Sequence, residues 1–236
     1  MFLRVREPGA RAALVLDRIA RVFLGLNLQR SIPSTVFLLM PQNSKLEAQI
    51  EFLVEVDKLK SVLRRNYAIH GDRRENSAEH SWHVALFAMV LAEHSNEPVD
   101  INRVVRMLVI HDIVEVDAGD TFIYDDTEKE TQVVREERAA DRLFGLLPQK
   151  QGELFRDLWD EFEAAATPEA KFAKAIDRFA AALHNYKTHG RGWSENGIKR
   201  DRVLAVNEYV RRGSAALWDK IQSFVNSATK EGFLQS

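Results

Sequence analysis

The sequence contains no cysteine, which excludes disulfide frameworks, thiolate metal sites and thiol nucleophiles. Any metal site must therefore use His, Asp and Glu side chains. Glycine and proline are also scarce, with 11 and 6 of 236 residues, which is too few for a collagen-like or loop-dominated chain. No apolar run approaches the roughly 18 residues that a membrane-spanning helix needs, so we expect a soluble protein without a membrane partner.

An excess of charge of one sign is absent as well. The 33 Lys and Arg residues face 35 Asp and Glu residues, which gives a formal net charge of -2. A chain with this balance creates no overall field that attracts nucleic acid, and we expect no nucleic-acid partner. Hydrophobic residues make up 45% of the chain, which is enough for one globular domain with a buried core.

The first 44 residues differ in composition from the rest, because they are rich in arginine, lack lysine and contain only Glu7 and Asp17 as acids. This pattern is compatible with a transit peptide or a signal sequence. However, the apolar run over 35–40 is too short for a signal sequence and ends at Pro41 without a small-residue cleavage site. We predict an accessory N-terminal extension over residues 1–44, a folded domain over residues 45–236 and a cytoplasmic location.

Apolar spacing from Lys45 onward is helical nearly everywhere, and no alternating strand pattern of useful length occurs. The apolar residues between 46 and 62 predict a first helix with one buried face. Helices should end near Gly119 and be stopped by Pro148. Capping signals predict further helix starts at Asn76 to Glu79, Asp100, Thr127 to Glu130 and Thr167 to Pro168. The predicted fold class is all-α.

Four ionisable residues lie on helix faces that should be buried: His80, Asp112 with its neighbour His111, and Asp177. A buried carboxylate is costly unless it is paired or bound to a cation. Each residue alone has a simpler explanation, since a lone buried histidine is usually a hydrogen-bonded core residue and a buried aspartate can pair with an arginine. Together, two imidazoles and two carboxylates form a ligand set suited to a divalent metal ion with open positions for water.

These residues resemble the H...HD...D signature of the HD-domain metal-dependent phosphohydrolases. The similarity spans roughly residues 45 to 225 and implies a compact HD-domain helical bundle. Within the superfamily, the chain is most similar to the 5'-deoxynucleotidase subgroup, on the basis of Leu59 to Arg64, Glu79 to Ser81, His111 to Glu115 and Gly119 to Asp120.

The resemblance implies roles for individual residues. His80, His111, Asp112 and Asp177 would bind one divalent metal ion, which would be manganese, cobalt or magnesium, with iron or zinc as alternatives. Glu115, four residues after His111, would act as a general acid or base, and Asp120 would lie near the sugar. Arg64 would bind the phosphate, with Arg65 as its competitor. His184 is interpreted as a core residue or a support for the ligands, whereas Trp82 and His83 should pack against neighbouring helices.

The predicted function is hydrolysis of the 5'-phosphate of deoxynucleoside or ribonucleoside monophosphates, with a small nucleotide as partner and a homodimer as the implied assembly. Other HD-type reactions remain open, namely those of a cyclic-nucleotide phosphodiesterase, a deoxynucleoside triphosphate triphosphohydrolase or an alarmone hydrolase. A different class of protein, a metal-stapled domain that senses a nucleotide without catalysis, is a further alternative. Glu115 and Asp120 argue against it, because a stapling site needs neither.

Overall fold

The structure, a computed structural model, describes residues 42–236. The N-terminal extension predicted over residues 1–44 therefore lies almost wholly outside the described residues. The described part is built from α-helices, shorter 3₁₀ helices at 57–61, 92–94 and 208–212, and one small hairpin, which confirms the predicted all-α fold class. The helices are α2 (Gln42–Val56), α3 (Ser77–Leu91), α4 (Ile101–Ile110), α5 (Glu115–Ala118), α6 (Asp126–Phe144), α7 (Gln149–Ala164), α8 (Pro168–Lys187), α9 (Arg191–Glu195), α10 (Arg200–Asn207) and α11 (Ala215–Lys230).

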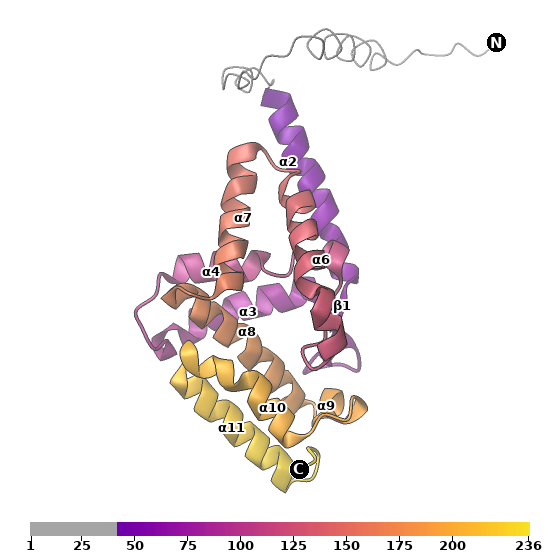
Figure 1. Ribbon diagram of the computed structural model, residues 1–236, viewed down its shortest axis with the longest axis vertical. Helices are drawn as coiled ribbons and strands as arrows, with labels where there is room; N and C mark the ends of the chain where they lie inside the picture. Colours follow the sequence, from indigo (N-terminus) through magenta and orange to yellow (C-terminus); the bar gives the residue numbers. More distant parts are fainter. Residues whose placement is uncertain (1–41) are drawn as a thin grey trace, which may run out of the picture. The chain divides into compact units, whose positions relative to one another are not determined.

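Helix α8 is the central element of this domain, and it contacts α3, α4, α7 and α11 (Figure 1). Its residues Phe172 and Ile176 are fully buried. Each such side chain stabilises the fold by about 1.5–3 kcal/mol relative to an exposed one. The packing explains why α8 can hold polar groups in a defined position, since the helix is fixed on several sides at once.

Three of the predicted helix starts are confirmed. Asn76 and Glu79 form a reciprocal capping box at the start of α3, Asp100 caps α4, and Thr167 caps α8 with Pro168 at its first position. Each cap satisfies backbone N–H groups that have no partner inside the helix.

The capping box predicted at Thr127 to Glu130 is wrong. Helix α6 begins at Asp126, and the side chain of Asp125 accepts hydrogen bonds from the backbone of Thr127 and Glu128. The cap is thus an aspartate two residues upstream, and Thr127 lies within the first turn of the helix. At the other end, α6 ends at Phe144, before Pro148, which instead precedes α7.

A two-stranded antiparallel hairpin, β1 (Leu63–Tyr67) and β2 (Arg74–Asn76), precedes α3 and was not predicted. Strands of five and three residues offer too few alternations to be recognised by their pattern. The hairpin contacts α3, α8 and α9, so the residues of β1 and β2 reach the interior of a helical domain.

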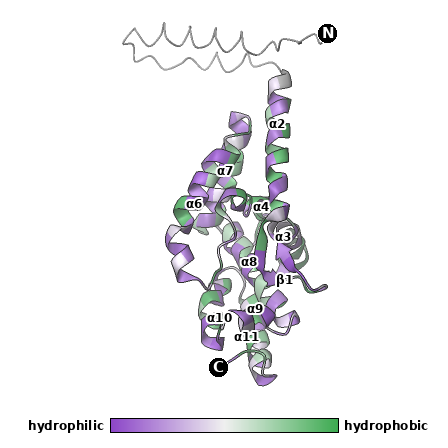
Figure 2. Cartoon of the chain, turned by 90° about the vertical axis from the view of Figure 1, so that its right-hand side faces the viewer, coloured by the Kyte–Doolittle hydropathy of each residue, from purple (hydrophilic) through white to green (hydrophobic). Residues whose placement is uncertain are grey.

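The predicted buried face of the first helix is wrong within α2, although Leu59, in the 3₁₀ helix that follows, is buried. Leu46, Ile50, Leu53 and Val54 of α2 are all at least half exposed, and hydrophobic residues are visible along this helix in Figure 2. The buried residue is Phe52, whose ring meets that of Phe155 on α7. The helix therefore packs through the face opposite to its apolar stripe.

No helix among residues 42–236 is long and apolar enough to cross a membrane.

Candidate active site

The capping box of α3 positions His80. Asn76 accepts a hydrogen bond from the backbone N–H of Glu79 at 3.0 Å, and Glu79 accepts one from the backbone of Asn76 at 2.7 Å. The helix therefore starts at a defined residue, and His80 in its first turn points into the domain with 1% of its surface exposed.

His111 and Asp112 lie in a tight turn between α4 and α5. The sequence predicts one continuous helix to Gly119, but α4 ends at Ile110. In the turn, backbone bonds join residues three apart, as from Glu115 N–H to the Asp112 carbonyl at 2.9 Å. This tighter winding brings both consecutive side chains into the interior, where each is less than 10% exposed.

The four predicted ligands come together in space. The Nε2 atom of His80 lies 3.0 Å from Asp177 Oδ1 and 4.0 Å from Asp112 Oδ2. The Nε2 atom of His111 lies 3.1 Å from Asp112 Oδ1 and 3.9 Å from Asp177 Oδ1. Residues 97 positions apart in the sequence thus meet at one point between α3, α8 and the turn after α4.

The donor chemistry of this cluster fits a divalent cation. His111 donates from Nδ1 to the Leu108 carbonyl at 2.8 Å, so Nε2 is the ring nitrogen left to act as a ligand. That Nε2 atom is buried without a hydrogen-bond partner in the described chain and faces two carboxylates. Ligand atoms of His80, His111 and Asp112 all lie within 4.8 Å of one another. A group of this kind, with a free nitrogen and carboxylate oxygens, can hold a metal ion.

The pKa values in the cluster are shifted because its charged groups lie close together. Burial and the charge of Arg64 disfavour protonated His80, but hydrogen bonds to Asp177 and Glu75, together with the charge of nearby carboxylates such as Asp112, raise the pKa of His80 to about 9. Burial alone would raise the pKa of Asp177, but the hydrogen bond with His80 and the nearby positive charges, including that of Arg64, together lower it. The carboxylates of the cluster therefore favour a positive charge at this point.

Arg64 and Arg65 point in opposite directions because they are consecutive residues of strand β1. Arg64 is 13% exposed and donates from Nη1 to Asp112 Oδ2 at 2.7 Å. Arg65 is exposed at the cavity rim, with its guanidinium 5.9 Å from the centre of the Phe122 ring. The strand thus places Arg64, and not Arg65, among the buried acids.

Glu115 and Asp120 both face Arg64, with carboxylate oxygens 3.9 Å and 3.8 Å from its Nη1 atom. Ser77 of α3 donates its hydroxyl to Glu115 Oε2 at 2.5 Å. Burial, reinforced by the charge of Asp112, raises the pKa of Glu115 well above its ordinary value. Burial also raises the pKa of Asp120, although Arg64 opposes this. Gly119 has a φ of +75°, which lets the chain turn sharply between the two acids.

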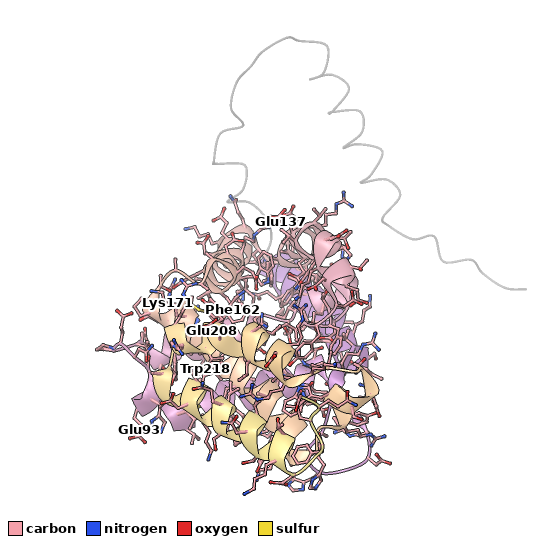
Figure 3. All side chains as sticks on the ribbon, turned by 60° about the horizontal axis from the view of Figure 1, so that its bottom comes forward. Glu93, Glu137, Phe162, Lys171, Glu208 and Trp218 are labelled. Carbon is pink, nitrogen blue, oxygen red and sulfur yellow. The ribbon has the colours of Figure 1, made fainter. Side chains whose placement is uncertain are left out.

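A cavity opens beside these groups. Phe162 forms part of the cavity wall. Figure 3 shows this residue inside the domain, whereas Glu93 and Glu137 project into solvent. The wall includes every predicted site residue except His80. It also contains residues that the sequence did not single out, among them the cations Lys129, Lys174 and Arg178, the acid Glu136, and the aromatic residues Phe122 and Tyr124. Their spacing in sequence carries no signal, because they come from separate helices and a loop.

Glu75 is a further residue that the sequence analysis missed. It lies in β2, is 3% exposed, and its Oε2 atom lies 3.3 Å from His80 Nδ1. Its Oε1 atom lies 3.6 Å from Nδ1 of His184, which is buried as predicted. Trp82, by contrast, is 66% exposed, so its predicted packing against neighbouring helices is wrong.

Comparison with known proteins identifies the class. A model of the HD domain family matches residues 56–218. The chain therefore belongs to the HD domain family, which confirms the resemblance that the histidine and aspartate signature predicts.

Three individual proteins show the similarity in more detail. The chain is similar to a solved structure described as a predicted metal-dependent phosphohydrolase from Magnetospirillum magnetotacticum MS-1, with 46% identity and a TM-score of 0.79 over 84% of this chain and 100% of that one. It is also 32% identical over 130 residues to the 5'-deoxynucleotidase HDDC2 of Homo sapiens, and 30% identical over 135 residues to the 5'-deoxynucleotidase hdd1 of Schizosaccharomyces pombe. These alignments span 55% of this chain, 62% of the human protein and 67% of the yeast protein.

Proposed function

We propose that this protein is a metal-dependent phosphohydrolase that removes the 5'-phosphate from nucleoside monophosphates, with deoxynucleosides preferred. One observation carries the proposal: Arg64, only 13% exposed, donates a hydrogen bond to Asp112 of the histidine and aspartate cluster at a cavity wall. A phosphate bound there would touch both a guanidinium and a cation. The similarity to 5'-deoxynucleotidases supports the choice of substrate.

His80, His111, Asp112 and Asp177 would hold the divalent cation. When bound, the ion would acidify a water ligand and offset negative charge on a phosphoryl oxygen. The remaining chemistry belongs to the residues around it. Hydrolysis joins the oxygen of water to phosphorus and breaks the bond between phosphorus and O5', so a proton must reach O5' as the nucleoside leaves.

Glu115 is the proposed source of that proton. Its raised pKa favours the protonated form, which is the form that a general acid needs. The Ser77 hydroxyl holds one of its oxygens, and so fixes the direction of the carboxyl group. Arg64 would bind two phosphate oxygens and keep phosphorus in line for attack.

Asp120 is proposed to accept a hydrogen bond from the sugar. It follows the turn at Gly119, and its carboxylate lies on the cavity wall close to Arg64. The aromatic residues Phe122 and Tyr124 follow it on the same wall and would cover the sugar or the base.

A phosphate-release screen tests the proposal. Purified protein is incubated with deoxyribonucleoside and ribonucleoside monophosphates, each with Mn²⁺, Co²⁺ or Mg²⁺ in parallel. We expect metal-dependent phosphate release, fastest with the deoxy substrates. Release from cyclic nucleotides or triphosphates in the absence of monophosphatase activity would replace this function with another HD-type reaction.

A further inference from the structure

A second group of potential metal ligands lies on the other side of His80. Glu75 of β2, His83 of α3 and His184 of α8 each offer one ligand atom, and these atoms lie within 4.8 Å of one another. The residues come from three different elements, separated by 8 and 101 positions in the sequence. None of them belongs to the cluster that holds the proposed catalytic ion.

The buried ring of His184 lacks hydrogen-bond partners of good geometry at both of its nitrogens among residues 42–236. The ring is only 3% exposed, and a backbone group of Tyr67 lies near it. The Oε2 atom of Glu75 faces His80 Nδ1 at 3.3 Å, so Oε1, which lies 3.6 Å from His184 Nδ1, is the atom left for a ligand. Buried polar atoms are nearly always satisfied in folded proteins, so the two ring nitrogens of His184 indicate a missing ligand.

We propose that Glu75, His83 and His184 bind a second divalent transition-metal ion, with Zn²⁺ as the best match. Two imidazoles and one carboxylate with a water ligand form a ligand set that zinc accepts. A tetrahedral ion with bonds of about 2.0–2.1 Å places its ligand atoms about 3.3–3.5 Å apart, so small side-chain rotations complete the shell. The Glu75 to His184 distance of 3.6 Å is already close to this value.

The surroundings favour the neutral histidines that a metal ion requires. Burial lowers the pKa of both His83 and His184, which favours the neutral form of each ring. His83 is half-buried, with its ring 4.4 Å from that of Phe87 and 5.5 Å from that of His184. Its partial exposure gives an ion a route from solvent, while Phe87 restricts the ring to one side.

An ion here would join β2, α3 and α8 and act as a clip between the hairpin and the two helices that carry His80 and Asp177. The clip has a thermodynamic consequence, because a ligand that binds only the folded state raises its stability. Zinc should therefore raise the melting temperature even when the first cluster has been disabled.

The experiment counts bound ions in the full-length protein. Metal is removed with a chelator, Zn²⁺ is added back, and the zinc content per chain is measured by mass spectrometry after dialysis. We expect two ions in the parent, one in the His111→Gln/Asp112→Asn variant and one in the His83→Gln/His184→Gln variant. His94→Gln is the matched control, because this exposed histidine lies outside both groups, and it should retain two ions.

Two further measurements keep the test decisive. Zinc should raise the melting temperature of the His111→Gln/Asp112→Asn variant by several degrees, and should not do so when His83→Gln/His184→Gln is added. If the double histidine variant fails to fold, His83→Gln alone should weaken the second binding event at least about tenfold. One ion in the parent, or two in the folded His83→Gln/His184→Gln variant, would overturn the second site.

Discussion

Arg64 donates a hydrogen bond from Nη1 to Asp112 Oδ2 at 2.7 Å, and so links the hairpin to the turn that carries the histidine and aspartate pair. The same guanidinium lies within 4 Å of further carboxylates. These are Glu75, Glu115, Asp120 and Asp177. A phosphate dianion entering a site with this many acids would be repelled unless a divalent cation joined Arg64 in offsetting their charge.

Replacing Arg64 by alanine should therefore impair substrate binding more than metal binding. We expect kcat/KM to fall by about 10- to 100-fold, since charge-assisted hydrogen bonds are worth about 1.5–3 kcal/mol. Steady-state kinetics and metal analysis check this together. Arg65→Ala is the comparison variant: because Arg65 lies at the cavity rim beside Phe122 and not among the acids, kcat/KM should fall less than in Arg64→Ala. The reverse ranking would assign the phosphate to Arg65.

Removing one ligand from the first cluster should abolish both metal binding there and turnover. In His111→Ala the ion loses a nitrogen ligand, and the two aspartates remain uncompensated in a buried site. Metal analysis and phosphate release measure the two losses. Isothermal titration calorimetry of the chelator-treated parent should also show no nucleotide binding. Tight binding without metal would show that the acids around Arg64 do not repel the phosphate.

Glu115→Ala separates proton transfer from metal binding. We expect hydrolysis to fall by about 10²–10⁴-fold with metal content and melting temperature near those of the parent, because Glu115 is proposed as a proton donor and not as a ligand. Glu137→Ala, at an exposed position of α6, is the control. A Glu115→Ala protein that has lost its metal would make this residue a support for the ligands instead.

Asp120→Ala should lower activity while metal is retained, and should reduce the preference for deoxynucleotides. A carboxylate that pairs with the sugar is left without its partner when the sugar is displaced, and a 2'-hydroxyl needs space that a site fitted to deoxyribose lacks. Rates for matched pairs of deoxyribonucleoside and ribonucleoside monophosphates check this. Equal rates for both sugars in the parent would indicate a general phosphomonoesterase.

The carboxyl group of Glu136 should make the stability of the folded protein depend on pH. It lies on the cavity wall, and burial raises its pKa to about 7, against an ordinary value of 4.5. The folded protein then binds more protons than the unfolded chain between these values, so stability falls as the pH rises from 4.5 to 7. Glu136→Gln should be more stable than the parent at pH 8, by up to about 3 kcal/mol, and equally stable at pH 4. Denaturant unfolding at both pH values measures this, and an equal difference at both would exclude titration as the cause.

Local signals in the sequence were sufficient to predict much of the fold of this protein. The helical spacing, the caps at Asn76, Asp100 and Thr167, and the fold class depend on contacts between residues a few positions apart, and these are legible in the chain itself. The signature of His80, His111, Asp112 and Asp177 could also be recognised in the sequence, although it is the turn after α4, and not a continuous helical stripe, that buries His111 and Asp112.

Tertiary structure decided which arginine enters the site, which face of α2 is buried and what Glu75 touches. Arg64 and Arg65 are equivalent in sequence until a strand turns one of them inward, and the strand is too short to be recognised alone. The apolar stripe of α2 predicted burial, but burial depends on where Phe155 of α7 lies, about a hundred residues away. The meeting of Glu75 with His184 likewise depends on how β2 packs against α8. A periodic pattern reports the environment along one element, whereas these contacts arise only when separate elements pack.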